Sequence, residues 1–418
     1  MDLVKTYGNI IRKNLETHPV AARRMINVGL SLENFRVQAF SDKRMPKASK
    51  ELNSLAVNKI REGLKTPEKT AWTNLFTPVE LLQCFDLNCL SVEAVSSFFS
   101  GFTIEDSFIR YGEGKGLAPS LCSYHKCFLG SFFSGVLPVP KLAVTASTAC
   151  DANFNTFRLA GKEARLPVFY LDIPGIRSEE AVDYVVRQLH ALLGSLEKLT
   201  HRKFDIDLLR EILQRENESK RLYLQFLKKK AKKAWPTTLT LQMYELFATH
   251  LSIGTAESLH FFRSLCKEID HMPDFHGKRL FWVHLIPFYH PVLKDALNFS
   301  DAFQLQGMEM NIDNTKPLDL KDPIRSLARK MIDNLYNRPF EYKEKLVLKA
   351  VRHTNADGVI HFCHWGCKQS IGGVMLLKEA MKKAGIPFLI LDGDGIDRTN
   401  DTPGQIKTRL EAFLEMIR

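Results

Sequence analysis

Two segments far apart in the chain share one pattern of strands, helix and side chains. In residues 141–172, a short apolar strand is followed by Cys150, a helical stretch to about residue 164 and a second apolar strand that ends in an aspartate. Residues 358–392 repeat this order with Cys367 in the place of Cys150. Continuous apolar strands joined by a helix are typical of parallel sheets that helices cover on both faces. Each segment predicts a right-handed βαβ unit, and together they predict an α/β protein with two Rossmann-like parallel-sheet domains.

The repeat also places the two cysteines. Cys150 and Cys367 both come just past the carboxyl end of a strand, where the next helix begins. In open α/β sheets, ligands bind beyond the carboxyl ends of the strands. We therefore expect two equivalent sites, which could face one another across a domain interface.

The rest of the chain divides around these units. Residues 1–68 are polar and helix-prone and predict an N-terminal helical extension. We expect a first α/β domain over residues 69–235, and a helical linker with the second α/β domain over residues 236–418. The apolar run 279–286 is predicted to be a strand that opens the second domain. Ser178 is the expected N-cap of a helix, because apolar residues follow it at helical spacing up to Leu196.

Composition places the chain among ordinary globular proteins, with 45% hydrophobic and 25% charged residues. No apolar run approaches the roughly 18 residues that span a bilayer, so no membrane partner is expected. The N-terminus lacks a basic start followed by an apolar stretch, which is the pattern of a secretory signal. We therefore expect a cytoplasmic protein.

The formal net charge of +11 suggests an anionic partner. The densest basic run is Lys228–Lys233, which has no interleaved aromatic residues and is accompanied by no nucleic-acid-binding motif. We interpret this run as the solvated end of a helix, and we expect no nucleic-acid partner.

Eight cysteines are candidates for chemistry, and a large cytosolic chain is not expected to use them as a disulfide framework. They are Cys84, Cys89, Cys122, Cys127, Cys150, Cys266, Cys363 and Cys367. Pro119 suits the first turn of a helix, so Cys122 is expected near a helix N-terminus, where the helix dipole favours a thiolate. Taken alone, Cys122 and Cys150 could each equally be structural.

The densest group of possible ligands lies in residues 361–370, which contain two cysteines and two histidines. Structural zinc sites usually pair such a knuckle with a second one, which the sequence lacks. Zinc, an iron–sulfur cluster and no metal therefore all remain open. The loops 392–397 and 112–116 contain glycines but match neither a dinucleotide-binding nor a P-loop pattern, and we interpret them as turns.

Several motifs occur in the order that is typical of one enzyme family. They are Phe76–Leu82 leading into Phe85–Asn88, Leu121–Tyr124, Ala146–Asp151, and the stretch from Asp357 through Asp392–Gly395 to Arg409–Leu414. Together they cover roughly residues 70–418, and in this order they resemble the 2-hydroxyacyl-CoA dehydratase and benzoyl-CoA reductase family.

The resemblance implies one [4Fe-4S] cluster per subunit, held by three cysteines. The matching positions are Cys122, Cys150 and Cys367. Cys363 competes for the third position, but Cys367 has the family's distance from the strand that follows Gly385. Three protein ligands leave one iron open for chemistry.

The resemblance also implies a glutamate that acts at the reacting carbons, and Glu93 matches it. The serine that acts with this glutamate has no clear match, so Thr73 or Asn74 would have to serve. This departure leaves the substrate open.

The implied function is that of a subunit of an (R)-2-hydroxyacyl-CoA dehydratase. This hydro-lyase removes water from a 2-hydroxyacyl-CoA thioester through a ketyl radical and gives a 2-enoyl-CoA. The implied partners are a homologous second subunit in a heterodimer and an ATP-dependent [4Fe-4S] activator protein. The alternatives are an ATP-activated reductase similar to benzoyl-CoA reductase and a non-enzymatic zinc- or cluster-binding interaction protein.

Overall fold

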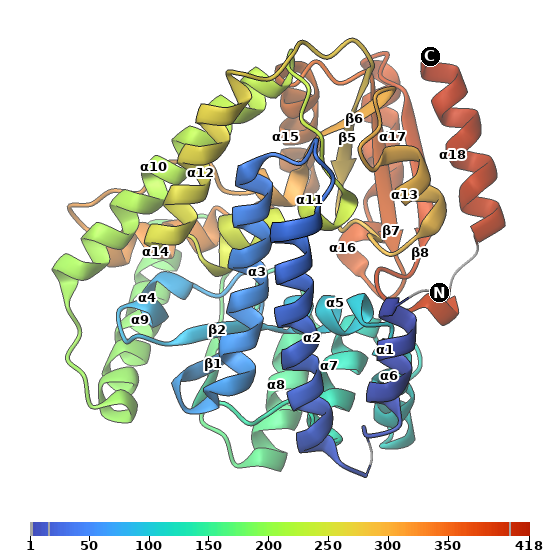
Figure 1. Ribbon diagram of the computed structural model, residues 1–418. Coiled ribbons are helices and arrows are strands. Elements are labelled where there is room, and N and C mark those ends of the chain that lie inside the picture. Colours follow the sequence, from blue (N-terminus) through green and yellow to red (C-terminus); the bar gives the residue numbers. More distant parts are fainter. Residues whose placement is uncertain (1–2, 16, 401–402) are drawn as a thin grey trace.

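Two four-stranded parallel sheets with the same strand order organise the protein (Figure 1). The structure is a computed structural model that describes residues 3–15, 17–400 and 403–418. The first sheet has the order β2-β1-β3-β4, with β1 (Thr70–Thr73), β2 (Asn88–Ser91), β3 (Leu142–Ala146) and β4 (Val168–Leu171). The second has the order β6-β5-β7-β8, with β5 (Lys278–Val283), β6 (Phe303–Met308), β7 (Gly358–His364) and β8 (Phe388–Gly393). The predicted α/β fold with two Rossmann-like sheets is confirmed.

Among the described residues, three α-helices precede the first strand and belong to the segment predicted as a helical extension. They are α1 (Leu3–Arg12), α2 (Pro19–Phe40) and α3 (Lys47–Lys65). Helix α3 packs against β2 and also against α11 (Leu239–Leu246) and α12 (Ala256–Ile269). The extension therefore contacts both the first sheet and the helices between the two sheets.

Most of the remaining helices connect or cover the strands. Those of the first half are α4 (Val79–Gln83), α5 (Val92–Gly101), α6 (Glu105–Gly114), α7 (Ser123–Phe133), α8 (Asp151–Ala164), α9 (Glu179–Thr200) and α10 (Ile206–Lys230). Those of the second half are α13 (Pro291–Leu297), α14 (Pro323–Ile332), α15 (Phe340–His353), α16 (Lys368–Ile371), α17 (Val374–Lys383) and α18 (Pro403–Ile417). The proposed division of the chain at residue 235 falls between α10 and α11.

The two halves share their hydrophobic packing. Successive residues of a strand point to opposite faces of its sheet. Trp72 of β1 and Trp282 of β5 lie in one core, whereas their neighbours Ala71 and Phe281 lie in the other. Both cores thus run continuously from the first sheet to the second. The junction between the sheets is held on two sides by apolar packing.

Local predictions from the sequence are met in part. The Ser178 hydroxyl accepts a hydrogen bond from the backbone N–H of Ala181 and caps α9, as predicted. The strand predicted over residues 279–286 ends at Val283, because His284 has a φ of 72° and its N–H donates to the Glu309 carboxylate. Lys230 closes α10 with its side chain fully buried, 5.5 Å from the Phe226 ring, so the solvated interpretation of the basic run is wrong for this residue. Within the described ranges, no helix is long and apolar enough to cross a membrane.

Candidate active site

The three cysteines matched to the family motif occupy the same local position. Cys122, Cys150 and Cys367 are the N-cap residues of α7, α8 and α16. All three side chains are partly exposed. Cys122 is thus at a helix N-terminus as predicted, but Pro119 is not in the first turn, because α7 begins at Ser123. At each N-cap, the free backbone N–H groups of the first turn favour negative charge on the thiol sulfur.

These thiols come together from both halves of the chain. Burial raises the pKa of Cys122 well above its usual value, and the neighbouring Cys367 and Cys150 thiols raise it further. Burial raises the pKa of Cys150 to about 11, with contributions from Cys367 and Glu93. A Cβ atom placed on Gly366 would lie 3.0 Å from the Cys122 backbone, so the two cysteine-bearing loops are in direct contact. Cys367 is close enough to Cys150 to contribute to its pKa, which agrees with the expected approach of the two strand-end sites.

Each of these sulfurs faces the Nε2 atom of one histidine ring. The Sγ–Nε2 distances are 3.1 Å for Cys122 and His364, 3.8 Å for Cys150 and His125, and 3.6 Å for Cys367 and His284. Burial lowers the pKa of all three histidines, to about 4 for His125 and well below the usual value for His284. The rings are consequently neutral near pH 7, and each carries a single N–H.

His364 has a defined tautomer. The backbone N–H of Gly395 donates to His364 Nδ1 at 2.9 Å, so Nδ1 carries no proton. A neutral imidazole has only one N–H, which must then be at Nε2. His364 therefore donates a hydrogen bond to the sulfur of Cys122.

Cys363, the alternative to Cys367 as the third ligand, does not lie at a helix N-terminus. Cys363 is buried inside β7, and its sulfur faces the Ser370 carbonyl at 3.7 Å. Burial raises the pKa of Cys363 to about 12. The same carbonyl is 2.7 Å from His361 Nε2, so the Cys–His motif of residues 361–370 does not converge into a knuckle.

The donors gathered here are thiols, which are the protein ligands of iron–sulfur clusters. Among the described residues, no group of three or more His, Cys, Asp or Glu side chains is arranged to hold one metal ion. The irons of a cubane occupy separate corners, so its thiolate ligands stand apart around it. Three partly exposed thiols at three helix N-termini fit that requirement, and a coordinating metal deprotonates a thiol outright.

Glu93 lies in the first turn of α5 and lines a small apolar cavity, here called the Glu93 cavity. One of its carboxylate oxygens is buried without a hydrogen-bond partner. Burial raises the pKa of Glu93, although hydrogen bonds from Ser91 and from the Leu75 backbone oppose the rise. Its charge acts on Cys150, which places it beside the cysteines.

The two residues considered as replacements for the serine are not available. Thr73 is fully buried within β1. The Asn74 side chain accepts from the Ala146 N–H at 3.1 Å and from the Thr77 hydroxyl at 2.6 Å, and it donates to the Ala146 carbonyl at 3.3 Å. Asn74 therefore joins the ends of β1 and β3 by hydrogen bonds.

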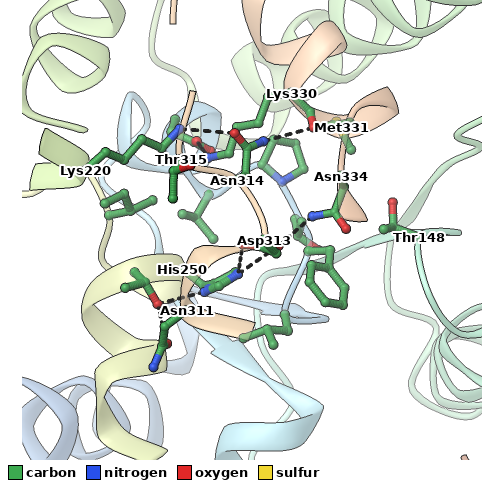
Figure 2. A pocket seen from close by; sticks show the side chains of 18 of the residues that line it. Thr148, Lys220, His250, Asn311, Asp313, Asn314, Thr315, Lys330, Met331 and Asn334 are labelled. Atoms are coloured by element: carbon green, nitrogen blue, oxygen red, sulfur yellow. Dashed lines mark hydrogen bonds and ion pairs between the residues drawn. The ribbon is translucent and has the colours of Figure 1, made fainter. Parts of the chain in front are cut away.

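A larger cavity, partly open to solvent, lies beside the cysteine loop of the first sheet (Figure 2). Thr148 lines it, two residues before Cys150, so we call it the Thr148 cavity. On the opposite side, His250 faces Asp313 at 3.4 Å, and Asn334 donates to Asp313 at 2.7 Å. Leu75 lines both this cavity and the Glu93 cavity.

The chain matches one known protein family over most of its length. The family described as 2-hydroxyglutaryl-CoA dehydratase, D-component, matches residues 74–417. The chain belongs to this family. The match contains Glu93 and all three N-cap cysteines, whereas α1–α3 lie before it.

Individual members of the dehydratase family are distant in sequence but similar in length. The (R)-phenyllactyl-CoA dehydratase alpha subunit of Clostridium sporogenes is 21% identical over 385 residues, which cover 85% of this chain and 91% of that protein. The (R)-2-hydroxyisocaproyl-CoA dehydratase alpha subunit of Clostridioides difficile is 21% identical over 88% of this chain and 95% of its own. A benzoyl-CoA reductase subunit of Thauera aromatica is 22% identical over 81% of this chain and 86% of its own.

Within this dehydratase-family chain, sequence reasoning included His364 among the possible metal ligands of residues 361–370, but it missed His125, His284 and both cavities. His125 lies three residues after Cys122, so its spacing from that cysteine could have singled it out. His284 carries no such signal, because only the end of β5 brings it to Cys367.

Proposed function

We propose that this chain is the cluster-bearing subunit of an (R)-2-hydroxyacyl-CoA dehydratase, which eliminates water from a CoA thioester by a ketyl radical route. One observation carries the proposal. Three partly exposed thiols, each at a helix N-terminus, meet where two parallel sheets join, in a chain of the 2-hydroxyglutaryl-CoA dehydratase family. Ligands of open α/β sheets bind at this edge of the strands.

Cys122, Cys150 and Cys367 would hold the cluster as thiolates. When bound, a [4Fe-4S] cluster with one open iron supplies single electrons and Lewis acidity. The protein's part is to fix the three sulfurs at helix N-termini and to direct the His364 N–H at one of them. Continuous cores on two sides of the junction hold the cysteine loops in place.

Glu93 is the proposed group for moving a proton or assisting departure of the hydroxyl. Its buried position raises the pKa of the carboxyl, so the proton is held at a higher pH than on an exposed glutamate. The unpartnered oxygen is the atom at which that proton can be given or taken. A general acid or base whose pKa lies nearer the working pH is the more effective one.

The partners follow from the relatives' names. The two dehydratase relatives are named as alpha subunits and the reductase relative as one subunit of its enzyme, which supports a homologous second subunit in a heterodimer. The sequence has no P-loop pattern, so we place the ATP-dependent step in a separate activator protein. We also propose a cytoplasmic location, where thiols stay reduced.

A reductase remains the second candidate because a benzoyl-CoA reductase is among the relatives. The two reactions differ in electron balance. A dehydration returns its electron after each turnover, whereas a reduction consumes electrons continuously. ATP use per product therefore separates them.

The test is an oxygen-free reconstitution. The purified chain with a homologous second subunit, an activator, ATP, a reductant and a panel of 2-hydroxyacyl-CoA esters should form enoyl-CoA, with many turnovers after one activation. Omitting either partner should abolish the product. A reduced product with ATP consumed in proportion would establish the reductase instead, and protein that binds zinc without acid-labile sulfide would refute both.

A further inference from the structure

The Thr148 hydroxyl, two residues before Cys150, lacks a hydrogen-bond partner. The Thr148 side chain is 1% exposed, and its Oγ1 atom has no partner in the structure. It lines the Thr148 cavity, and Figure 2 shows it across the cavity from His250 and Asn311. A buried hydroxyl without a partner is costly, so it is usually satisfied by something that binds there.

Other buried hydroxyls do not share this placement. Thr73 of β1, Thr145 of β3 and Tyr124 of α7 also lack partners, but all three are buried and line neither cavity. Between Thr148 and Cys150, Ala149 has a φ of 73°. A left-handed alanine is an unfavourable conformation that persists where the surroundings impose it, often at functional sites. It sets the direction of the chain between the hydroxyl that lines the cavity and the thiol that caps α8.

The charged groups that line the Thr148 cavity are already paired. Lys330 contacts both Glu80 and Glu216, and Lys220 lies 2.8 Å from Glu216. Among the described lining residues, each lysine thus has a carboxylate. Asp313 likewise pairs with His250. A ligand carboxylate entering this space would meet no unpaired cation and would lose its own hydration.

By area the remaining wall of the cavity is mostly apolar, with Leu75, Phe76, Val79, Ile253 and Phe262 in its lining. The amides of Asn311, Asn314 and Asn334 also line it, and each already donates to a protein acceptor. Such a surface favours hydrocarbon over charge, because removing apolar area from water is favourable.

We infer that Thr148 is a positioning residue that hydrogen-bonds the 2-hydroxyl group of the substrate, and that the acyl chain in the Thr148 cavity is uncharged. The inference rests on the proposed function, since it presumes a 2-hydroxyacyl-CoA. It narrows the substrate class to thioesters with an aliphatic or aromatic tail rather than a second carboxylate. The thioester end then lies toward Cys150, two residues along the chain.

The test measures binding, without turnover, to anaerobically purified holoprotein. The probes are 2-hydroxyisocaproyl-CoA, its deoxy analogue isocaproyl-CoA, and 2-hydroxyglutaryl-CoA. For the unaltered protein we expect 2-hydroxyisocaproyl-CoA to bind more tightly than 2-hydroxyglutaryl-CoA by about tenfold or more, because the second carboxylate would be desolvated without a partner.

Thr148→Val keeps the shape of the side chain and removes the hydroxyl. Its Kd for 2-hydroxyisocaproyl-CoA should rise about tenfold, the loss expected for one hydrogen bond, while its Kd for isocaproyl-CoA stays within about twofold. Thr148→Ser should bind like the unaltered protein. Thr145→Val, which removes an unpartnered hydroxyl outside the cavity, is the matched control and should change neither Kd.

The outcomes separate this inference from the proposed function. Equal weakening of both thioesters in Thr148→Val, or no weakening of either, would overturn the role of Thr148 while acyl-CoA binding stands. Preference for 2-hydroxyglutaryl-CoA would overturn the uncharged acyl chain. A holoprotein that binds none of the three thioesters would refute the inference together with the proposed function.

Discussion

In the first sheet the chain leaves β3, passes Ala149 in a left-handed conformation and begins α8 at Cys150. In the second it leaves β7, passes Gly366 in the same conformation and begins α16 at Cys367. The two loops are thus built alike but packed differently. Gly366 lies against the Cys122 backbone, where a Cβ atom would come within 3.0 Å.

The two halves also differ in the glutamate that follows an edge strand of each sheet. Glu93 follows β2 and leaves one oxygen unpartnered in an apolar cavity. Glu309 follows β6 and is held by Lys343 at 2.8 Å, by the Tyr336 hydroxyl at 2.6 Å and by the His284 N–H. One half contributes two thiols and a carboxyl with an unpartnered oxygen to the junction. The other contributes one thiol and a carboxylate that is fully engaged by an ion pair and hydrogen bonds within the fold.

The largest expected effect concerns the thiols themselves. Cys122→Ala, Cys150→Ala and Cys367→Ala should each lose most of the iron from protein that otherwise carries about four irons per chain, the content of one cubane. Iron and acid-labile sulfide analysis of anaerobically purified protein measures this.

The control within the second half is Cys363→Ala, which should keep its iron because its sulfur faces the Ser370 carbonyl. Cys84→Ala and Cys266→Ala should also keep it. Iron loss in Cys363→Ala with retention in Cys367→Ala would move the ligand onto β7 and undo the likeness of the two loops.

The two carboxylates should respond oppositely to neutralisation. Glu309→Gln leaves the buried Lys343 amine without its counter-charge and should lower the free energy of unfolding by about 3–5 kcal/mol. Glu93→Gln removes a lone buried carboxyl and should not destabilise the fold, although dehydration should fall by roughly 100-fold or more if the carboxyl transfers a proton. Urea unfolding under anaerobic conditions gives the first quantity, and the reconstituted assay gives the second.

The raised pKa of Glu93 also predicts that folding stability depends on pH. The folded-state pKa of Glu93 is raised by burial, so its proton favours the folded state at low pH and that contribution is lost as pH rises through the folded-state pKa. The stability of Glu93→Gln relative to the unaltered protein should therefore increase from acid to neutral pH. A difference that is flat or falls with pH would show that Glu93 ionises without penalty.

The two left-handed residues give a smaller contrast. Gly366→Ala places a Cβ atom against the Cys122 backbone at positive φ and should cost about 2–3 kcal/mol of stability. Ala149→Gly relieves a left-handed alanine but frees the unfolded chain, so its effect should lie within about 1 kcal/mol. Thermal or urea unfolding of both variants measures these changes in stability. Equal changes in the two variants would contradict the expected difference.

The smallest expected effect concerns the hydrogen bonds to sulfur. His364→Phe removes a donor at 3.1 Å from Cys122 and should lower the midpoint potential of the bound cluster by roughly 40 mV, the equivalent of about 1 kcal/mol. His125→Phe should shift it less, because its Nε2 lies 3.8 Å from Cys150. Redox titration followed by EPR measures both, and a larger shift in His125→Phe would reverse this order.

The local elements could be predicted from the sequence. The apolar runs around Cys150 and Cys367 required parallel strands and crossover helices, because only a doubly covered sheet buries both faces of such a strand. A cysteine just past each strand then had to fall at a helix N-terminus, and the ordered motifs named the family and Cys122 as the third thiol. These inferences depend on residues that are neighbours in sequence or on motifs in a fixed order, so a single sequence was enough to draw them.

Only the tertiary structure decided which groups meet. His284 reaches Cys367 from the end of another strand, and Thr148 is left without a partner because of what packs around it. The burial of Lys230 and the pairing of Glu309 with Lys343 likewise depend on helices far away in the chain. Such contacts follow from the way two sheets and their shared cores pack in three dimensions, and no spacing along the chain records that arrangement.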